Sequence, residues 1–490
     1  MEKTAIEHGV SNDYQNNFTK YLDQEKQAVS LQHSVGTLMY DKGIELVLFR
    51  NPLTDVSISE ILQLHEYAEG VIGKHISVND SAELAAEILK MDLAPSKLDI
   101  GRLSAEWLDE HGKYDSKAAF LNDKLSGFKP GNESAIKPKD VVLFGFGRIG
   151  RLAARELIKQ AGKGQQLRLR AIVVRKMDKS QLKKRAYLLR NDSVHGPFPG
   201  SVVEDYDNMA LIINGQRVSF ISANTPEEID YTNFGIEDAL IIDNTGVFKD
   251  REALSRHLKA KGASKVLLTA PGKEIPNIVY AVNSKDLDFE VENIFSAASC
   301  TTNAIVPTLK VIHDNLGVEK GHIETVHAYT NDQNLLDNFH KKERRGRSAA
   351  INMVITETGA GKAVTKVIPE LANKLTANAV RVPVPNGSLA ILNLTVGKET
   401  SLEEVDALLK NAALHGDLVN QINYNTNEEC VSSDIVGNTC CSVYDSNATI
   451  VHPDKKNIVL YVWYDNEFGY TKQVIRLAKS ISKVRRLIYY

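Results

Sequence analysis

Cysteine is scarce in this chain, which has four among 490 residues. So few cysteines in so long a chain do not form a disulfide framework. Cys440 and Cys441 are adjacent and Cys430 is nearby, but a metal site needs more ligands at suitable spacing. We therefore interpret these three as small core or surface residues and predict no metal centre.

Long apolar runs and an excess of one charge are also lacking. No run is long enough to span a bilayer, and Met1 to His8 lack the apolar core of a secretory signal. The 59 Lys and Arg nearly balance the 62 Asp and Glu, giving a net charge of -3. Charge thus gives no general reason to expect nucleic acid or an acidic membrane as a partner. We expect a soluble, cytoplasmic protein.

What is present is the composition of an ordinary globular protein, 43% hydrophobic and 25% charged. Its length allows two or three domains with a sizeable core. Pro, Gly, Asn and Ser between Lys129 and Ser134 favour a linker after the first zone. No repeat and no low-complexity tract is visible.

The first zone, residues 1–130, is predicted to be mainly helical and carries no motif with chemistry. The run from Ile44 to Phe49 fits a helix or a strand, because periodicity cannot decide for so short a segment. Capping-box spacing and apolar stripes indicate the helices. The expected helices start at Ser57 with Glu60, start at Asp80 with Glu83, and span 104–108 and 116–125.

A glycine pattern opens the second zone. The apolar run Val141–Phe144 leads into Gly145, Gly147 and Gly150 in the spacing G-x-G-x-x-G, and a helix-forming stretch follows from Arg151 to Gln160. Strand, turn and helix in that order are the context of a dinucleotide-binding turn. Its glycines allow a tight turn, a close approach to a pyrophosphate and close helix packing. A plain glycine turn is the alternative.

Strands and helices alternate after this turn, with further apolar strands at 171–174, 239–242 and 266–268. Such alternation predicts a parallel, doubly wound sheet. Beyond residue 300 a helix is followed by longer strands, at 388–396 and 458–463, and by a final helix near 471–483. The predicted domains are 138–299 for the cofactor, 300–462 for catalysis and a C-terminal helix, 463–490, that returns to the cofactor domain.

Cys300 and His327 are the candidate catalytic pair. Residues 301–315 are predicted to form a helix, so Cys300 would lie at the helix start, where the dipole favours a thiolate. A nearby base makes a cysteine nucleophilic near neutral pH. A buried, inert cysteine and a core histidine are the ordinary alternative for two such residues.

Six motifs together resemble phosphorylating glyceraldehyde-3-phosphate dehydrogenase in order and separation. The resemblance runs from about Lys139 into the C-terminal region and excludes the first zone. It implies a Rossmann cofactor domain followed by an α+β catalytic domain with a mixed sheet, whose final helix returns to the cofactor domain. The motifs are 145–151, 192–196, 244–248, 299–303, 381–383 and 463–470.

The resemblance also implies the chemistry. Cys300 attacks the aldehyde, His327 acts as the base, a nicotinamide cofactor takes hydride, and inorganic phosphate attacks the thioester on Cys300. Thr330 and Arg381 match positions for the substrate phosphate, with Asp332 and Arg345 in the same loops. Ser299, Thr301, Thr358 and Gly359 match positions for the attacking phosphate.

For the cofactor, the resemblance adds Asn466 at the nicotinamide carboxamide and Tyr470 near the ring. Backbone N–H groups of Arg148 and Ile149 are expected at the pyrophosphate. Positions along the riboses are Thr245, Gly246, Phe248 and Thr269.

The sequence departs from NAD-type relatives after the second strand. Lys176 aligns with the acidic residue that binds the ribose 2′-hydroxyl, and Arg175 precedes it. Two cations favour a 2′-phosphate, so we predict NADP, with NAD as the other cofactor. Asp178 favours NAD instead, because a small shift of the loop would bring its carboxylate to the ribose. A further alternative is that Arg175 and Lys176 both point into solvent.

Other departures are the segment Ala223–Pro226, where relatives often carry an arginine near the adenine, and the N-terminal zone itself. That zone is interpreted as a packed appendage, with a regulator site, a recruited enzyme or tetramer cover as alternatives. The resemblance implies a homotetramer in glycolysis or gluconeogenesis. Erythrose-4-phosphate dehydrogenase, and a binding protein that kept the fold without activity, remain alternative functions.

Overall fold

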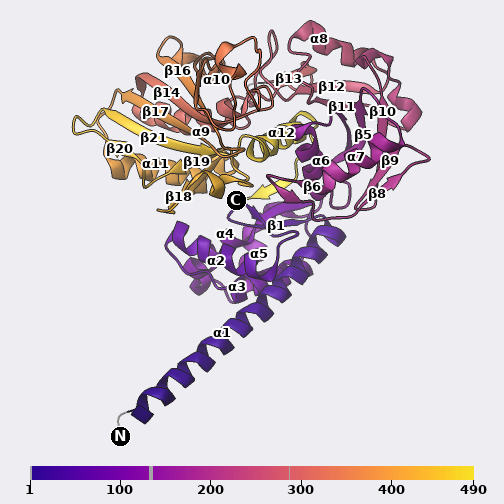
Figure 1. The fold of residues 1–490 in the computed structure, drawn as a ribbon. Helices are drawn as coiled ribbons and strands as arrows, with labels where there is room; N and C mark the ends of the chain where they lie inside the picture. The colour runs from indigo at the N-terminus through magenta and orange to yellow at the C-terminus, as the bar shows by residue number, and fades with distance from the viewer. Residues whose placement is uncertain (1–2, 132–135, 286) are drawn as a thin grey trace. The chain divides into compact units, whose positions relative to one another are not determined.

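The computed structural model describes residues 3–131, 136–285 and 287–490, with side chains from residue 13 onward (Figure 1). The chain divides into two compact units. Unit 1 comprises Met1–Ile136 together with Arg486–Tyr490, and unit 2 comprises Lys137–Arg485. The two units are thus joined by the chain at two points, once before Lys137 and once after Arg485.

Unit 1 is mainly helical around a small sheet. Its strands are β1 (Glu45–Leu48), β2 (Asn51–Pro52), β3 (Ser96–Asp99) and β22 (Leu487–Tyr489). Its α-helices are α1 (Lys3–Thr37), α2 (Ile58–Ile72), α3 (Val78–Lys90), α4 (Ile100–Glu110) and α5 (Lys117–Lys124). Within the ambiguous run from Ile44 to Phe49, Glu45–Leu48 therefore form a strand, and all four of its residues are buried.

The sheet of unit 1 has the order β2-β1-β3-β22, with β22 parallel to β3. The predicted helical end of the chain therefore needs correction: the last helix stops at Ile481, and Leu487–Tyr489 form an edge strand. Arg486 enters the interior of unit 1, where its Nη1 lies 3.7 Å from a carboxylate oxygen of Glu45. Tyr489 donates a hydrogen bond to Glu106 and stacks edge-on against Phe128.

The helix caps of unit 1 test the local predictions. Ser57 and Glu60 form the predicted reciprocal capping box at the start of α2. The start predicted at Asp80 is wrong, because Ser77 caps α3 and Asp80 lies inside its first turn. Asp99 caps α4, so this helix begins before the predicted residues 104–108. Ser116 caps α5 near the predicted position.

Helix α1 was not predicted. Figure 1 shows its amino-terminal half as a rod that extends beyond the other helices of unit 1. Tyr14, Phe18, Tyr21 and Val29 are exposed on it, whereas Leu31 and Val35, nearer its carboxyl end, are buried. Only the carboxyl-terminal part of α1 therefore contributes to the core of unit 1.

The first half of unit 2 is an α/β Rossmann fold. Its sheet has the order β13-β12-β11-β4-β5-β10-β9-β8, parallel from β13 to β10. The strands are β4 (Lys139–Phe144), β5 (Leu167–Val174), β8 (Val202–Asp205), β9 (Ala210–Ile213), β10 (Gln216–Ser222), β11 (Ala239–Asp243), β12 (Ala263–Leu268) and β13 (Ile294–Ser296). The helices are α6 (Arg148–Lys159), α7 (Lys179–Arg190) and α8 (Arg251–Ser255), and β6 (Asn191–Asp192) pairs with β7 (Gly196–Pro197).

The second half of unit 2 is an α+β fold with a mixed sheet of order β15-β16-β14-β17-β21-β19-β18, with β20 beside β21. The strands are β14 (Val318–Ala328), β15 (Val354–Thr356), β16 (Leu375–Val382), β17 (Ser388–Val396), β18 (Ile422–Asn425), β19 (Ser442–Asp445), β20 (Ile450–Val451) and β21 (Asn457–Tyr464). The helices are α9 (Cys300–Leu316), α10 (Ala360–Val367), α11 (Leu402–Leu414) and α12 (Phe468–Ile481).

Helix α12 crosses from the mixed sheet to the Rossmann half of unit 2. Lys472 forms a buried ion pair with Glu156 of α6, and Lys479 donates to the side chain of Gln160 just after that helix.

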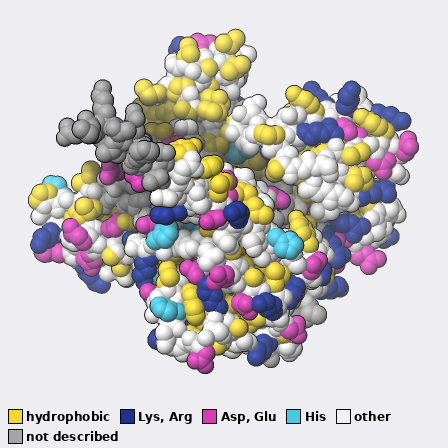
Figure 2. Space-filling view, turned by 90° about the horizontal axis from the view of Figure 1, so that it is seen from below, with side chains coloured by type: hydrophobic (Ala, Val, Ile, Leu, Met, Phe, Trp, Pro, Cys, Tyr) yellow, Lys and Arg dark blue, Asp and Glu magenta, His cyan; other side chains and the backbone are white. Residues whose placement is uncertain are grey.

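Lys and Arg side chains are mixed with Asp and Glu on the face seen in Figure 2, outside the grey atoms. Within the described residues, no helix is long and apolar enough to cross a membrane.

Candidate active site

Cys300 is the first residue of α9, and Ser299 caps the helix by accepting from the N–H of Thr302 at 3.0 Å. His327 lies near the carboxyl end of β14, and its Nε2 is 3.6 Å from the sulfur of Cys300. Two residues 27 positions apart are thus brought to contact distance. The arrangement suits proton transfer from the thiol, and the N-terminus of α9 favours the resulting negative charge.

Burial disfavours the charged form of both residues of this pair, whereas the charge of Arg381 acts differently on each. Burial, with the charge of Arg381 second, lowers the pKa of His327 to about 3. Burial also raises the pKa of the Cys300 thiol, an effect that Arg381 and Thr301 only partly offset. A neutral thiol beside a neutral imidazole is therefore favoured in the free protein.

Arg381 competes with a backbone carbonyl for the other nitrogen of the His327 ring. Its Nη1 is 2.6 Å from Nδ1 of His327 and also donates to the carbonyl of Ala328 at 2.9 Å. Nδ1 itself lies 2.7 Å from that carbonyl. Nδ1 either accepts from Arg381 or donates to Ala328, so the position of Arg381 determines whether Nε2 is free to accept a proton.

A cavity of about 530 Å³ opens over the sulfur. It joins the helix start of the glycine-rich turn to the carboxyl ends of β14 and β16. The sequence-predicted residues that line it are Arg148, Ile149, Thr269, Ser299, Cys300, His327, Thr330, Arg381, Asn466 and Tyr470. This size fits a small ligand with part of a cofactor.

The two predicted phosphate positions differ in their surroundings. Thr330 donates to Asp332, which pairs with Arg345, and Arg345 also donates to Thr356 at 3.1 Å. Arg345 is thus tied into the loop beside the cavity. Its side chain supports Thr330 through Asp332.

Thr358 and Gly359 precede α10, where Gly359 is the cap residue and Thr358 accepts from the N–H of Ala360 at 3.2 Å. They are not among the residues lining the cavity over Cys300. Thr301 shares a 3.2 Å hydrogen bond with the Tyr464 hydroxyl. The predicted set for the attacking phosphate is therefore spread over two helix starts, those of α9 and α10.

The glycine-rich turn has the geometry of a dinucleotide cradle. Gly145 has a φ of 96°, a conformation that favours glycine, and Gly147 caps α6. A Cβ on Gly150 would lie 2.5 Å from the carbonyl oxygen of Gly145, whereas one on Gly147 would meet nothing within 4 Å. The first N–H groups of α6, including those of Arg148 and Ile149, have no partner within the helix. The turn therefore fits a bound pyrophosphate.

The Arg148 side chain is held by two carboxylates of the protein. It donates to Glu467 at 2.9 Å and to Asp192 at 2.5 Å, both from distant parts of the chain. Backbone N–H groups and Arg148 lower the pKa of Asp192 to about 2 against the opposing effect of burial. Nε2 of His195 lies 3.2 Å from a carboxylate oxygen of Asp465. Asp465 directly precedes Asn466, which lines the cavity over Cys300.

This network was not predicted from the sequence, although it lies within the motifs 192–196 and 463–470. Asn466, which was predicted at the nicotinamide carboxamide, is held by Ser388, whose hydroxyl donates to its Oδ1 at 2.8 Å. The backbone N–H of Asn466 donates to Asn386 at 3.2 Å. The amide nitrogen of Asn466 makes no hydrogen bond with the described residues, so it fits a carbonyl acceptor such as a carboxamide oxygen.

The remaining residues that were predicted to contact the cofactor follow neighbouring strands. Thr245 and Thr269 both hydrogen-bond Asp243, at its side chain and its backbone carbonyl respectively. Gly246 has a φ of 66°, and Phe248 is buried. The Tyr470 hydroxyl donates to the carbonyl of Ala298 at 3.0 Å, which fixes its ring beside the cavity.

Arg175 and Lys176 follow β5 and are exposed. In the described part of the chain, neither side chain makes a hydrogen bond or an ion pair. Asp178 is the cap of α7 and accepts from the N–H of Gln181 at 2.8 Å. The Asp178 carboxylate, the alternative partner of a ribose hydroxyl, is thus used to cap α7. The side chains of Arg175 and Lys176 remain available to a ligand.

Two family patterns match the chain. Residues 139–251 match the NAD binding domain of glyceraldehyde 3-phosphate dehydrogenase, and residues 299–466 match its C-terminal domain. Both matches lie in unit 2 and cover the glycine-rich turn, Cys300 and His327. Among the described residues, no group of three or more His, Cys, Asp or Glu could hold a metal ion.

Several curated proteins are similar. A glyceraldehyde-3-phosphate dehydrogenase-like protein of Pseudomonas aeruginosa is 46% identical over 92% of this chain and 98% of its own length. Glyceraldehyde-3-phosphate dehydrogenases of Clostridium pasteurianum and Nostoc are 40% and 41% identical, over 71% and 70% of this chain and 99% and 98% of their own. Coverage of 92% leaves about 39 of 490 residues unmatched, so the Pseudomonas relative shares much of the N-terminal region.

Proposed function

The chain belongs to the glyceraldehyde-3-phosphate dehydrogenase family and is an NAD-dependent type of oxidoreductase; we propose that it oxidises glyceraldehyde 3-phosphate with inorganic phosphate to 1,3-bisphosphoglycerate, reversibly. The single observation that carries the proposal is the 3.6 Å contact between Cys300 and His327 at the start of α9. A cavity with Arg381 and Thr330 on its wall lies over that sulfur.

We propose that the phosphate of the substrate binds Arg381 and Thr330. Its negative charge offsets the charge of Arg381, which otherwise lowers the pKa of His327. The pKa of His327 then rises, and Nδ1 donates to Ala328 once Arg381 turns to the phosphate. Nε2 is thereby free to accept the Cys300 proton as the sulfur attacks the aldehyde carbon.

The product of this attack is a hemithioacetal on Cys300. His327 returns the first proton to the carbonyl oxygen and then accepts the hydroxyl proton as the carbon loses hydride. The nicotinamide ring, when bound, supplies the hydride acceptor. Inorganic phosphate then attacks the thioester carbon, an acyl phosphate leaves, and Cys300 departs as thiolate. The helix start holds that thiolate.

We place the attacking phosphate between Ser299, Thr301, Thr358 and Gly359, where two helix starts and three hydroxyls offer donors. The cofactor would lie along the glycine-rich turn, with the amide nitrogen of Asn466 donating to its carboxamide. NADP is favoured over NAD because Arg175 and Lys176 are exposed cations and Asp178 caps α7.

The proposed domains are 138–299 for the cofactor and 300–462 for catalysis. A homotetramer, a cytoplasmic location and a place in glycolysis or gluconeogenesis remain predictions from the family resemblance.

The test is a set of initial rates with glyceraldehyde 3-phosphate and NADP or NAD, with and without phosphate. The expected result is reduction that requires phosphate and is faster with NADP. Turnover with erythrose 4-phosphate but not with glyceraldehyde 3-phosphate would change the proposed substrate and leave the proposed mechanism unchanged. Absence of turnover with either aldehyde would contradict the proposed function and favour a binding protein that kept the fold.

A further inference from the structure

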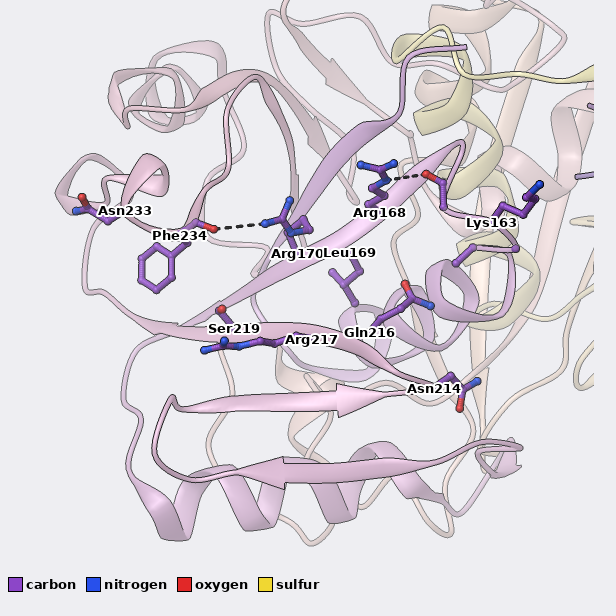
Figure 3. A pocket seen from close by; sticks show the side chains of 13 residues that line it. Lys163, Arg168, Leu169, Arg170, Asn214, Gln216, Arg217, Ser219, Asn233 and Phe234 are labelled. Carbon is purple, nitrogen blue, oxygen red and sulfur yellow. Dashed lines mark hydrogen bonds between the residues drawn. The ribbon is translucent and has the colours of Figure 1, made fainter. Parts of the chain in front are cut away.

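Unit 2 has a second cavity, of about 750 Å³, on the Rossmann half (Figure 3). Its walls come from the first residues of β5 and β10, the loop after α6 and the segment around Phe234. The glycine-rich turn follows the other end of these parallel strands, since Phe144 pairs with Val173. Arg168 and Val173 are five residues apart on β5, roughly 16 Å along an extended strand. The second cavity therefore lies at the opposite edge of the sheet from the cofactor turn.

The lining of this cavity is strongly cationic. Lys163, Arg168, Arg170 and Arg217 line it, and none of the thirteen lining residues is an Asp or a Glu. Arg170 pairs with Asp140, which lies outside the lining, at 2.9 Å. A strand surface exposed to solvent normally mixes charges of both signs, so a hollow with four cations and no lining carboxylate attracts anions.

Two of these cations are held in place by backbone. Arg168 Nε donates to the carbonyl of Gly164 at 2.6 Å, and Arg170 Nη2 lies 3.4 Å from the carbonyl of Phe234, as the dashed lines in Figure 3 indicate. A carbonyl at Nε leaves the terminal nitrogens of Arg168 as donors. The fork is thus partly fixed before any ligand binds, which lowers the entropy lost on binding.

Arg217 extends from β10, the strand next to β5. It is exposed and makes no hydrogen bond or ion pair within residues 13–131, 136–285 and 287–490. The nearby carboxyl of Asp205 has its pKa lowered mainly by Asn208 and to a smaller extent by Arg217. Asp205 is not in the lining, so Arg217 remains available to an anion in the cavity.

The rest of the lining supplies neutral donors and one ring. The neutral polar side chains are Asn214, Gln216, Ser219 and Asn233. Asn214 accepts from the N–H of Ser201 through Oδ1 at 2.8 Å, so its amide nitrogen remains a donor. Phe234 is 41% exposed and lies at the end of the cavity beside Arg170. A flat apolar group can stack on such a ring.

We propose that this cavity binds a nucleoside polyphosphate at a site separate from the cofactor. Arg168, Arg217 and Lys163 would take the phosphates, and Phe234 would stack on the base. The partly fixed fork of Arg168 suits phosphate oxygens, and the exposed ring favours a nucleotide over a simple inorganic anion. The volume lies within the range of small-ligand sites.

The test titrates ATP and inorganic tripolyphosphate separately into the full chain by calorimetry, with the cofactor site saturated with NADP. Both ligands are expected to bind, with ATP tighter because the base adds stacking. The double variant Arg168→Gln, Arg217→Gln is expected to weaken both by about tenfold or more, since each lost charged hydrogen bond is worth on the order of a factor of ten. Phe234→Leu should weaken ATP and leave tripolyphosphate unchanged.

The matched control is Lys320→Gln with Lys456→Gln, which removes two exposed cations from the second half of unit 2, one on β14 and one just before β21. This control should bind both ligands as the wild type does. Dehydrogenase rates should be the same in all these variants, because none of the changed residues lies at the cavity over Cys300. Absence of binding, binding that disappears when NADP is present, or equal losses in the control would overturn the site. Equal affinity for ATP and tripolyphosphate would overturn its nucleoside part.

Discussion

Arg381 holds its Nη1 2.6 Å from Nδ1 of His327, the ring nitrogen that does not face Cys300. One cation therefore acts on both partners of the catalytic pair. It disfavours a protonated His327 and favours a thiolate at Cys300. Removing this charge should raise both pKa values.

The variant Arg381→Gln tests this relationship. The pKa of Cys300 should rise, so the pH at which iodoacetamide alkylation reaches half its maximal rate should move upward. The value of kcat/KM should fall roughly 10- to 100-fold, because a charged hydrogen bond to the substrate phosphate is lost. An unchanged alkylation profile would mean that Arg381 does not influence the thiol.

Cys300 and His327 make separate predictions about the chemistry. Cys300→Ser should abolish phosphate-dependent turnover while NADP binding, followed by fluorescence, stays intact. His327→Gln should lower kcat by about 10²–10⁴-fold, the usual contribution of a general base. Full activity in either variant would contradict the thioester mechanism.

Cofactor preference should depend on the two cations after β5. Arg175→Ala combined with Lys176→Asp should lower kcat/KM for NADP by roughly 10–100-fold and leave or improve that for NAD, because charged contacts to a 2′-phosphate are lost. The control is Asp178→Ala, which should leave the cofactor ratio unchanged and cost about 1 kcal/mol of stability through its helix cap. A changed ratio of kcat/KM for the two cofactors in Asp178→Ala would mean that Asp178 contacts the ribose.

Two glycines of the turn should respond differently to alanine. Gly150→Ala introduces a methyl group 2.5 Å from the carbonyl oxygen of Gly145, so it should lower the melting temperature as well as cofactor affinity. Gly147→Ala meets no protein atom within 4 Å, so its melting temperature should stay unchanged while the pyrophosphate is displaced. Thermal unfolding and cofactor titration of both variants separate the two roles. Unaltered cofactor affinity in Gly147→Ala would contradict close approach of the pyrophosphate.

His327 should also contribute a pH dependence to stability. Its folded pKa of about 3 lies below the usual histidine pKa of 6.5, so the unfolded chain binds the proton first as the pH falls. Stability is therefore lost progressively from about pH 6.5 downward, by about 1.4 kcal/mol at pH 5.5. Urea unfolding at pH 7.5 and 5.5 should show a smaller difference for His327→Gln than for the wild type. Equal differences would mean that His327 is not held neutral.

Local sequence signals predicted much of the fold. The apolar runs before and after the glycine turn are strands because they are buried on both faces, and the cap at Ser57 satisfies N–H groups in its own helix. The start at Asp80 was wrong because Ser77, three residues earlier, provides the cap. Helix α1 was missed because its amino-terminal half is exposed. A helix that packs against no core needs no regular spacing of apolar residues. Strand β22 was missed because its partner β3 lies almost 400 residues away.

The candidate site shows the same division. Cys300 and His327 were predicted from motifs, and their 3.6 Å contact agrees with a shared role. The bonds from Arg148 to Asp192 and Glu467 were not predicted, because pairing across 44 and 319 residues leaves no local pattern. The availability of Nδ1 in His327 likewise depends on β14 and β16 lying in register.

Strand β22 has a consequence for the order of biosynthesis. Residues 3–131 leave the ribosome first, yet the strand that covers the edge of β3 is translated only after the whole of unit 2. Until then the nascent chain presents an open parallel edge at Ser96–Asp99, and Glu45 lacks the guanidinium of Arg486. A chain whose synthesis stops within unit 2 would therefore leave unit 1 without its edge strand.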